Sequence, residues 1–254
     1  MVGALGTLAG MIPRDVVLIG VPTNSSGTAD GVARAPAVLR GRGLTAALAG
    51  RPGFTDAGDL ALPAPQPRRG PSGLLAEDAL IVMIGQVRGA VRAAREDGRF
   101  PLLIGGDCPV ILGALAALQA EAREPGLLFV DGHEDAWPPR VSPTGEAADC
   151  ELGLALRMFD GALGPRLRAV LPAPWWLHTD LDVLATTELA AVDYPQPGGL
   201  TWRQLGQLTS AALATPGCAG WSVCIYNPDL DPGRGGADAI ISYLTGAITA
   251  AGRR

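Results

Sequence analysis

Short, continuous apolar runs alternate with longer helical stretches along this chain, and that alternation limits the fold more than any other feature. Residues 16–21 (VVLIGV) and 126–130 (GLLFV) are apolar at nearly every position rather than at every second one. Runs of this kind are typical of strands covered on both faces, as in a parallel sheet flanked by helices. We therefore predict an α/β fold with a mainly parallel central sheet.

The pattern predicts five strands, at residues 16–21, 101–104, 126–130, from 175–178 onward and 220–226. It predicts four helices, at residues 33–41, 74–97, 109–122 and 237–251. The Pro-rich stretch 60–72 is expected to be a surface loop. No linker is long enough to divide the chain, so we expect a single domain over residues 1–254.

Composition excludes several classes of protein. The net charge of −5 disfavours binding to nucleic acid, which requires clustered positive charge. All 20 basic residues are Arg, so neither a lysine Schiff base nor a P-loop lysine can operate. No apolar run reaches the roughly 18–20 residues of a membrane span. The first 11 residues lack the basic start of a signal peptide, and the expected location is the cytoplasm.

The four cysteines, Cys108, Cys150, Cys218 and Cys224, form no CxxC pair. A zinc ribbon and a thioredoxin motif are therefore not expected. Four cysteines in 254 residues are also too few for a disulfide scaffold.

Potential metal ligands follow three of the predicted strands. In open α/β sheets, ligands bind beyond the carboxyl ends of the strands, so residues at these positions are the first candidates for a site. The candidates are Cys108 after the second strand, Asp131, His133 and Asp135 after the third, and Asp180 and Asp182 in the fourth.

Alternation of side chains along an extended backbone predicts that Asp131, His133 and Asp135 share one face, and that Asp180 and Asp182 also point the same way as each other. Like charges held so close together are costly unless a cation neutralises them. Carboxylate and imidazole ligands suit Mn²⁺, Fe²⁺, Zn²⁺ or Co²⁺. Carboxylates can also bridge two ions, which can then activate a shared water.

Each element of this pattern also has an ordinary structural explanation. The D-x-H-x-D stretch alone can be a solvated turn. A histidine in an apolar strand, such as His178, is more often a core residue than a ligand, and Cys108 alone is more often a small buried hydrophobe. Their recurrence after successive apolar strands favours a site.

Motifs along nearly the whole chain resemble those of one known family. They are Gly20-Val21-Pro22 with Gly31 and residues 35–40 (APAVLR), Asp56-Ala57-Gly58-Asp59, Gly105-Gly106-Asp107-Cys108, the D-x-H-x-D of Asp131 to Asp135, the D-x-D of Asp180 to Asp182, residues 197–201 (PGGLT), and Asn227-Pro228 with Asp231. Taken together they resemble the ureohydrolases, the family of arginases, agmatinases and formimidoylglutamases.

The resemblance implies a three-layer α/β/α fold and two divalent metal ions, with Mn²⁺ the first expectation. It implies that one ion is held by Cys108, Asp131, Asp135 and Asp180, and the other by Asp131, His133, Asp180 and Asp182. A bridging hydroxide would then attack a guanidinium or amidine carbon. Asp135 would orient the hydroxide and pass a proton to the leaving amine.

Several positions depart from the family pattern. Cys108 replaces a metal-binding His, and its softer sulfur shifts the preference toward Zn²⁺ or Fe²⁺. A Cys here resembles the hydroxyarginine-hydrolysing branch. The loop 142–149 lacks the His that arginases carry, so Glu146 or Asp149 could supply acid/base function, although both also suit a helix N-terminus. Ile225 replaces a guanidinium-pairing Glu, which disfavours an unmodified, fully cationic guanidinium substrate.

The interval between Asp135 and Asp180 is also short, at 44 residues. The family usually has an extra strand-and-helix unit there, so either that unit is lost or the chain is internally shortened. Trp137, Trp175 and Trp176 could fill part of the space, or could simply pack in the core. Ala185-Thr186 stands where the family usually has D-P.

The leading hypothesis is a metal-dependent hydrolase acting on a linear C–N bond of a small guanidino, amidino or N-hydroxyguanidino compound. Asp135 and Glu146 are its expected catalytic residues. One alternative is a catalytically silent ureohydrolase-like protein with a binding or assembly role. Another is a reactive thiol at Cys108, which nearby carboxylates disfavour by raising its pKa. Family members are often trimers or hexamers, so the resemblance allows a homo-oligomer.

Overall fold

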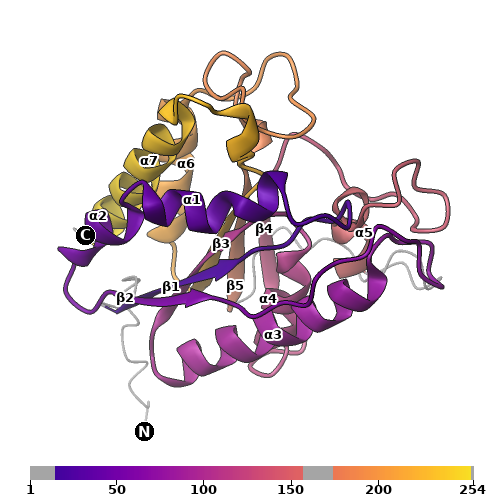
Figure 1. The fold of residues 1–254 in the computed structure, drawn as a ribbon. Coiled ribbons are helices and arrows are strands. Elements are labelled where there is room, and N and C mark those ends of the chain that lie inside the picture. Colours follow the sequence, from indigo (N-terminus) through magenta and orange to yellow (C-terminus); the bar gives the residue numbers. More distant parts are fainter. Residues whose placement is uncertain (1–14, 157–173, 253–254) are drawn as a thin grey trace, which may run out of the picture.

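Six parallel strands form one central sheet in the computed structural model, which describes residues 15–156 and 174–252 (Figure 1). The order across the sheet is β2-β1-β3-β6-β5-β4, and every pairing is parallel. The strands are β1 (Val16–Val21), β2 (Thr55–Asp59), β3 (Phe100–Gly105), β4 (Gly126–Val130), β5 (Trp175–Asp180) and β6 (Cys218–Cys224).

Helices cover both faces of this sheet. One layer contains α3 (Glu77–Glu96) and α4 (Val110–Leu118), with the short α5 (Glu151–Ala155) packed on α4. The opposite layer contains α1 (Ala35–Gly41), α2 (Leu44–Ala49), α6 (Trp202–Leu213) and α7 (Gly235–Ala251) (Figure 1). The predicted three-layer α/β/α architecture is confirmed.

The continuous apolar runs are buried as the pattern predicts. Every residue of β1, β3 and β5 is buried, because helices lie against both faces of these strands. Trp175 and Trp176 belong to this core and are almost completely enclosed. Trp137 is half exposed and lies outside it. Two of the three tryptophans thus pack as ordinary core residues.

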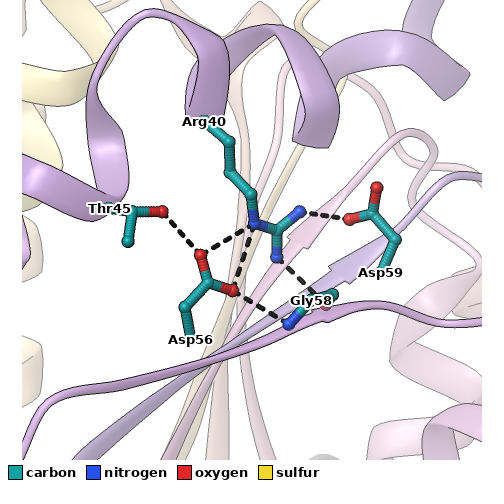
Figure 2. Close-up of polar contacts among 5 residues, drawn as sticks. All are labelled: Arg40, Thr45, Asp56, Gly58 and Asp59. Atoms are coloured by element: carbon teal, nitrogen blue, oxygen red, sulfur yellow. Dashed lines mark hydrogen bonds and ion pairs between the residues drawn. The ribbon is translucent and has the colours of Figure 1, made fainter.

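The D-x-G-D motif forms the edge strand β2 and ties it to helix α1 (Figure 2). Arg40 Nε donates to both oxygens of Asp56, at 3.1 and 3.0 Å, and another nitrogen of Arg40 is paired with Asp59. Thr45 Oγ1 and the backbone N–H of Gly58 also donate to Asp56. Burial raises the pKa of Asp56, but these hydrogen bonds hold it below its ordinary value. The motif is therefore a structural clamp.

Each predicted strand and helix has its counterpart, with ends shifted by a few residues. The pattern missed the elements β2, α2, α5 and α6. It also missed the 3₁₀ turns η1 (Gly31–Arg34), η2 (Ala147–Asp149), η3 (Leu181–Val183) and η4 (Pro228–Leu230). Residues 157–173, within the interval expected to be shortened, lie outside the described residues, so that expectation stays a prediction.

Candidate metal centre

The strand order brings the three ligand-bearing segments to one edge of the sheet. Strands β3, β6, β5 and β4 are neighbours in that order, and their carboxyl ends point the same way. Cys108 lies three residues beyond β3, Asp131 directly follows β4, and Asp180 is the last residue of β5. Residues far apart in the sequence therefore meet at the position where open α/β sheets bind ligands.

The backbone that carries these side chains is not extended, which corrects the predicted alternation. Strand β4 ends at Val130, and Asp135 has a φ of +40° in the left-handed region. Asp182 lies in the 3₁₀ turn η3. Each first aspartate caps its own turn: Asp131 accepts the N–H of His133 at 2.7 Å, and Asp180 accepts the N–H of Asp182 at 2.7 Å.

One ligand group consists of Asp131, His133 and Asp182, whose donor atoms lie within 4.8 Å of one another. His133 Nδ1 lies 2.8 Å from Asp182 Oδ2, and its Nε2 lies 2.9 Å from the side-chain nitrogen of Gln196. A metal ion bound through Nδ1 would place the ring proton on Nε2, which faces the side-chain amide of Gln196. Asp182 also accepts the N–H of Gly132 at 3.0 Å, which fixes the carboxylate between the two loops.

Cys108 belongs to the same edge of the sheet. Its Sγ donates to Asp180 Oδ2 at 2.9 Å, and both side chains are buried. Cys108 also groups with Asp131 and Glu151, their donor atoms again lying within 4.8 Å of one another. Burial and the charges of Cys224 and Asp180 raise the pKa of the Cys108 thiol well above its ordinary value. A thiolate nucleophile in the metal-free protein is therefore disfavoured, as the sequence predicted.

Asp107 and the loop after β1 hold Cys108 in place. Asp107 is buried and accepts the N–H of Ser25 at 2.7 Å and that of Cys108 at 3.0 Å. Gly106, just before it, is closely covered, since an added Cβ would lie 2.0 Å from the carbonyl oxygen of Thr23. The G-G-D-C segment is therefore held rigidly by backbone contacts from a distant loop.

Glu151, which the sequence analysis did not single out, lies at the base of this cluster. Its side chain is fully buried, and neither carboxyl oxygen has a donor partner among the described residues. Burial and the charges of Asp135 and Asp131 raise its pKa well above the ordinary value. No sequence signal marks Glu151, because an acid beginning a helix is ordinary.

The metal-free carboxylates repel one another strongly. Burial, followed by the charges of Asp135 and Asp182, raises the pKa of Asp131 to about 9. Burial also raises the pKa of Asp135 to about 6, partly offset by contact with Glu151 and His133. The second oxygen of Asp131 is buried without a partner among the described residues. A divalent cation would neutralise these charges and occupy that oxygen, so the donor set fits one.

Glu146 and Asp149 lie in the loop where arginases carry a His. Asp149 accepts from the hydroxyls of Ser142 and Thr144, so it serves the loop itself. Glu146 is half-buried, and burial with the charge of Asp107 raises its pKa to about 7. Glu146 is not a member of the ligand groups found among the described residues, so its predicted acid/base role stays a prediction.

Two further side chains, those of Ile225 and His178, are buried. Ile225 directly follows β6, has a φ of +70°, and is only 7 % exposed, so an apolar side chain takes the place of the missing carboxylate. His178 is fully buried in β5, and burial lowers its pKa to about 3. It is therefore neutral, as a core histidine or a metal ligand would be.

Known proteins resemble this chain in both sequence and fold. The family model described as "Arginase family" matches residues 14–153, which is more than half of the chain. The chain belongs to the arginase family. Among curated relatives, arginase from Staphylococcus aureus (strain MRSA252) is 29 % identical over 157 residues, which is 60 % of this chain and 50 % of the relative. The match thus spans about half the length of that arginase.

Solved structures of arginase-family proteins share the whole fold. Arginase from Bacillus subtilis superimposes with a TM-score of 0.77 at 16 % identity, covering 92 % of this chain and 98 % of that one. The agmatine ureohydrolase of Thermoplasma volcanium gives a TM-score of 0.69 at 18 % identity, covering 96 % and 94 %. At such identities the likeness shows the fold alone. Of the helices described for this family member, none has the length and apolar character needed to cross a membrane.

Proposed function

We propose that this arginase-family protein is a metal-dependent hydrolase of a linear C–N bond in a small guanidino, amidino or N-hydroxyguanidino compound. The observation that carries the proposal is the group formed by Asp131, His133 and Asp182, next to the Cys108–Asp180 contact, at the carboxyl edge of the sheet. Family membership supports hydrolysis as the reaction class. A cytoplasmic location and a homo-oligomeric state, both expected from the sequence, stay predictions.

The donor set supports two divalent ions. We assign Cys108, Asp131, Asp135 and Asp180 to one ion, and Asp131, His133, Asp180 and Asp182 to the other. Oxygen and imidazole donors suit Mn²⁺ on the His133 side, whereas the sulfur of Cys108 favours Zn²⁺ or Fe²⁺ on its own side. Bound ions of this kind supply an activated water at neutral pH.

The residues of the chain would position the substrate and move the proton. Asp135 would orient the attacking hydroxide and exchange a proton with the leaving amine, as the family resemblance implies. Glu146, with a pKa of about 7, is a second candidate at the loop.

The apolar side chain of Ile225 bears on the choice of substrate. A carboxylate at that position would pair with a full cation, and none is present. We therefore expect weaker binding of an ordinary guanidinium than of an N-hydroxyguanidino compound, whose positive charge is more easily lost.

The test is hydrolysis of a panel of guanidino, amidino and N-hydroxyguanidino compounds by metal-loaded protein, with the released amine measured by chromatography. Losing a metal ligand should cost more activity than losing a residue that only hydrogen-bonds the ligand. Turnover of at least one compound should therefore fall by about a hundredfold or more in Asp131→Asn and Asp180→Asn. Asp149→Asn is the matched control and should retain turnover. Equal turnover in all three variants would refute the proposal.

A catalytically silent homologue with a binding role is the second candidate. Two observations favour it: the buried Ile225 replaces a carboxylate, and the loop contains no His. It predicts protein that binds metal without turnover on any compound of the panel. Adding the missing carboxylate distinguishes the two, because Ile225→Glu should create activity only if the rest of the site is competent.

A further inference from the structure

Three soft donor atoms meet beneath the carboxylates. The sulfurs of Cys108 and Cys224 and a ring nitrogen of His178 all lie within 4.8 Å of one another. They come from three neighbouring parts of the sheet, the loop after β3, the end of β6 and the middle of β5. All three side chains are buried, with at most 1 % of any of them exposed.

The register of the sheet places these groups together. His178 pairs with Ser222, and Asp180 pairs with Cys224, across the β5–β6 ladder. Paired residues point to the same face of a sheet, and so do residues two positions apart on one strand. The side chains of His178, Asp180, Ser222 and Cys224 therefore lie on one face of the sheet. Gly105 provides space for the sulfur of Cys224, because an added Cβ there would lie 2.5 Å from that sulfur.

The imidazole of His178 is held with one nitrogen unused. Its Nδ1 lies 2.7 Å from Ser222 Oγ, which also accepts a hydrogen bond from Trp176 Nε1 at 3.0 Å. Its ring stacks on Phe129 with centroids 5.3 Å apart. Nε2 is buried and has no hydrogen-bond partner among residues 15–156 and 174–252. Burying such an atom is costly unless something occupies it.

The donor chemistry fits one ion of zinc. Zn²⁺ binds thiolate sulfur at about 2.3 Å and imidazole nitrogen at about 2.0–2.1 Å, which separates tetrahedral ligands by roughly 3.5–3.8 Å. That spacing lies within the observed limit of 4.8 Å. Two thiolates balance the charge of one divalent ion, so the set can be buried without net charge. Ser222 is the outer partner that a metal-bound histidine usually has.

We infer that Cys108, His178 and Cys224 form a buried thiolate–imidazole site for Zn²⁺ on the Cys108 side of the centre. Asp180, whose Oδ2 lies 2.9 Å from Cys108 Sγ, would be the fourth ligand, and its carboxylate would give the occupied site a net charge of −1. The group of Asp131, His133 and Asp182 is then left to a harder ion such as Mn²⁺. The inference shares Cys108 and Asp180 with the proposed function, and it puts His178 and Cys224 in place of Asp131 and Asp135 as ligands of the ion on the Cys108 side. It predicts a pair of unlike ions.

The test is Co²⁺ substitution, because Co²⁺ bound by thiolate absorbs strongly in the near ultraviolet. The full chain is produced in Co²⁺-containing medium so that a buried site is loaded during folding. Wild type should show the thiolate band, and Cys224→Val and His178→Gln should each lower it by at least about half, because each removes a ligand. Cys218→Ser, on the same strand but outside the group, is the matched control and should keep the full band.

Carboxylate variants separate this inference from the proposed function. His133→Ala and Asp182→Ala should abolish hydrolysis while leaving the Co²⁺–thiolate band in place. A band that persists in Cys224→Val and His178→Gln would overturn the inference, since Cys108 would then serve the carboxylate group alone.

A second measurement needs no variant and covers the case in which substitutions impair folding. X-ray absorption of wild-type protein loaded with Zn²⁺ should show two sulfur ligands and an imidazole. Coordination by one sulfur or none would overturn the inference, as would the absence of bound zinc.

Discussion

At the scale of single residues, Glu146 gives a prediction about pH. Burial, then the charges of Asp107, Asp149 and Asp193, raise its folded pKa from 4.5 to about 7. The folded state therefore holds this proton more tightly, and its contribution to stability is lost as pH rises through about 7. Glu146→Gln cannot ionise. Its melting temperature should match that of wild type near pH 4 and exceed it increasingly from pH 5 to pH 8.

The measurement is thermal unfolding across that pH range, followed by circular dichroism. Glu124→Gln is the control, because Glu124 is exposed. Its melting temperature should not diverge from that of wild type in this way. A constant difference between Glu146→Gln and wild type at all pH values would contradict the assignment.

The Arg40–Asp56 clamp gives a prediction about stability. Arg40→Met removes the donor to two carboxylates and leaves Asp56 partly buried without its cation. The Arg40–Asp56 ion pair is only partly exposed, so its loss should lower the free energy of unfolding by roughly 1–3 kcal/mol, between the values for surface and buried pairs. Arg92→Met breaks an exposed pair with Glu96 and should cost at most about 0.5 kcal/mol. Urea unfolding measures both, and equal effects would contradict a structural role for the clamp.

The sequence predicted part of the site at this scale. Cys108, Asp131, His133 and Asp182 were selected because they follow apolar strands, and the structure brings them together. Their role as ligands stays a prediction. The unused nitrogen of His178 and the buried carboxyl of Glu151 were beyond sequence reasoning, because both depend on contacts with residues far away in the chain.

At the scale of elements, the contact between α3 and α4 depends on Gly113. An added Cβ at Gly113 would lie 2.6 Å from Val87 Cβ and 2.9 Å from the carbonyl oxygen of Ile84, both in α3. Gly113→Ala should therefore destabilise the fold by about 1–3 kcal/mol through overpacking.

Gly85→Ala in α3 is the matched control, since nothing lies within 4 Å of its added Cβ. That substitution should stabilise by roughly 0.5–1 kcal/mol through higher helix propensity. Chemical unfolding of both variants measures the contrast. A stabilising Gly113→Ala would show that the two helices can separate without loss.

The missed elements have identifiable causes. Strand β2 is polar and alternates between exposed and partly buried residues, so only its pairing with β1 defines it as a strand. Helix α6 did carry a readable signal, because Thr201 and Gln204 form a capping box at its start. The apolar strands could be predicted because a strand buried on both faces is an almost uninterrupted run of apolar residues.

At the scale of the whole molecule, the layer architecture could be predicted and the strand order could not. Apolar runs alternating with helical stretches are sufficient to indicate a parallel sheet covered on both sides. The order β2-β1-β3-β6-β5-β4 depends on how the helical connections between strands pack against the sheet, and no short sequence pattern predicts it. Yet this order places β6 between β3 and β5, which allows Cys224 to meet Cys108 and His178.

Metal content tests the central claim most directly. Elemental mass spectrometry is applied to protein produced with both Mn²⁺ and Zn²⁺ available, for wild type, Asp131→Asn and Asp180→Asn. Wild type should hold about two divalent ions per chain, and each variant should lose at least about one, because each aspartate is proposed as a ligand of at least one ion. No bound ion in wild type, or the same content in all three proteins, would contradict a metal-dependent hydrolase.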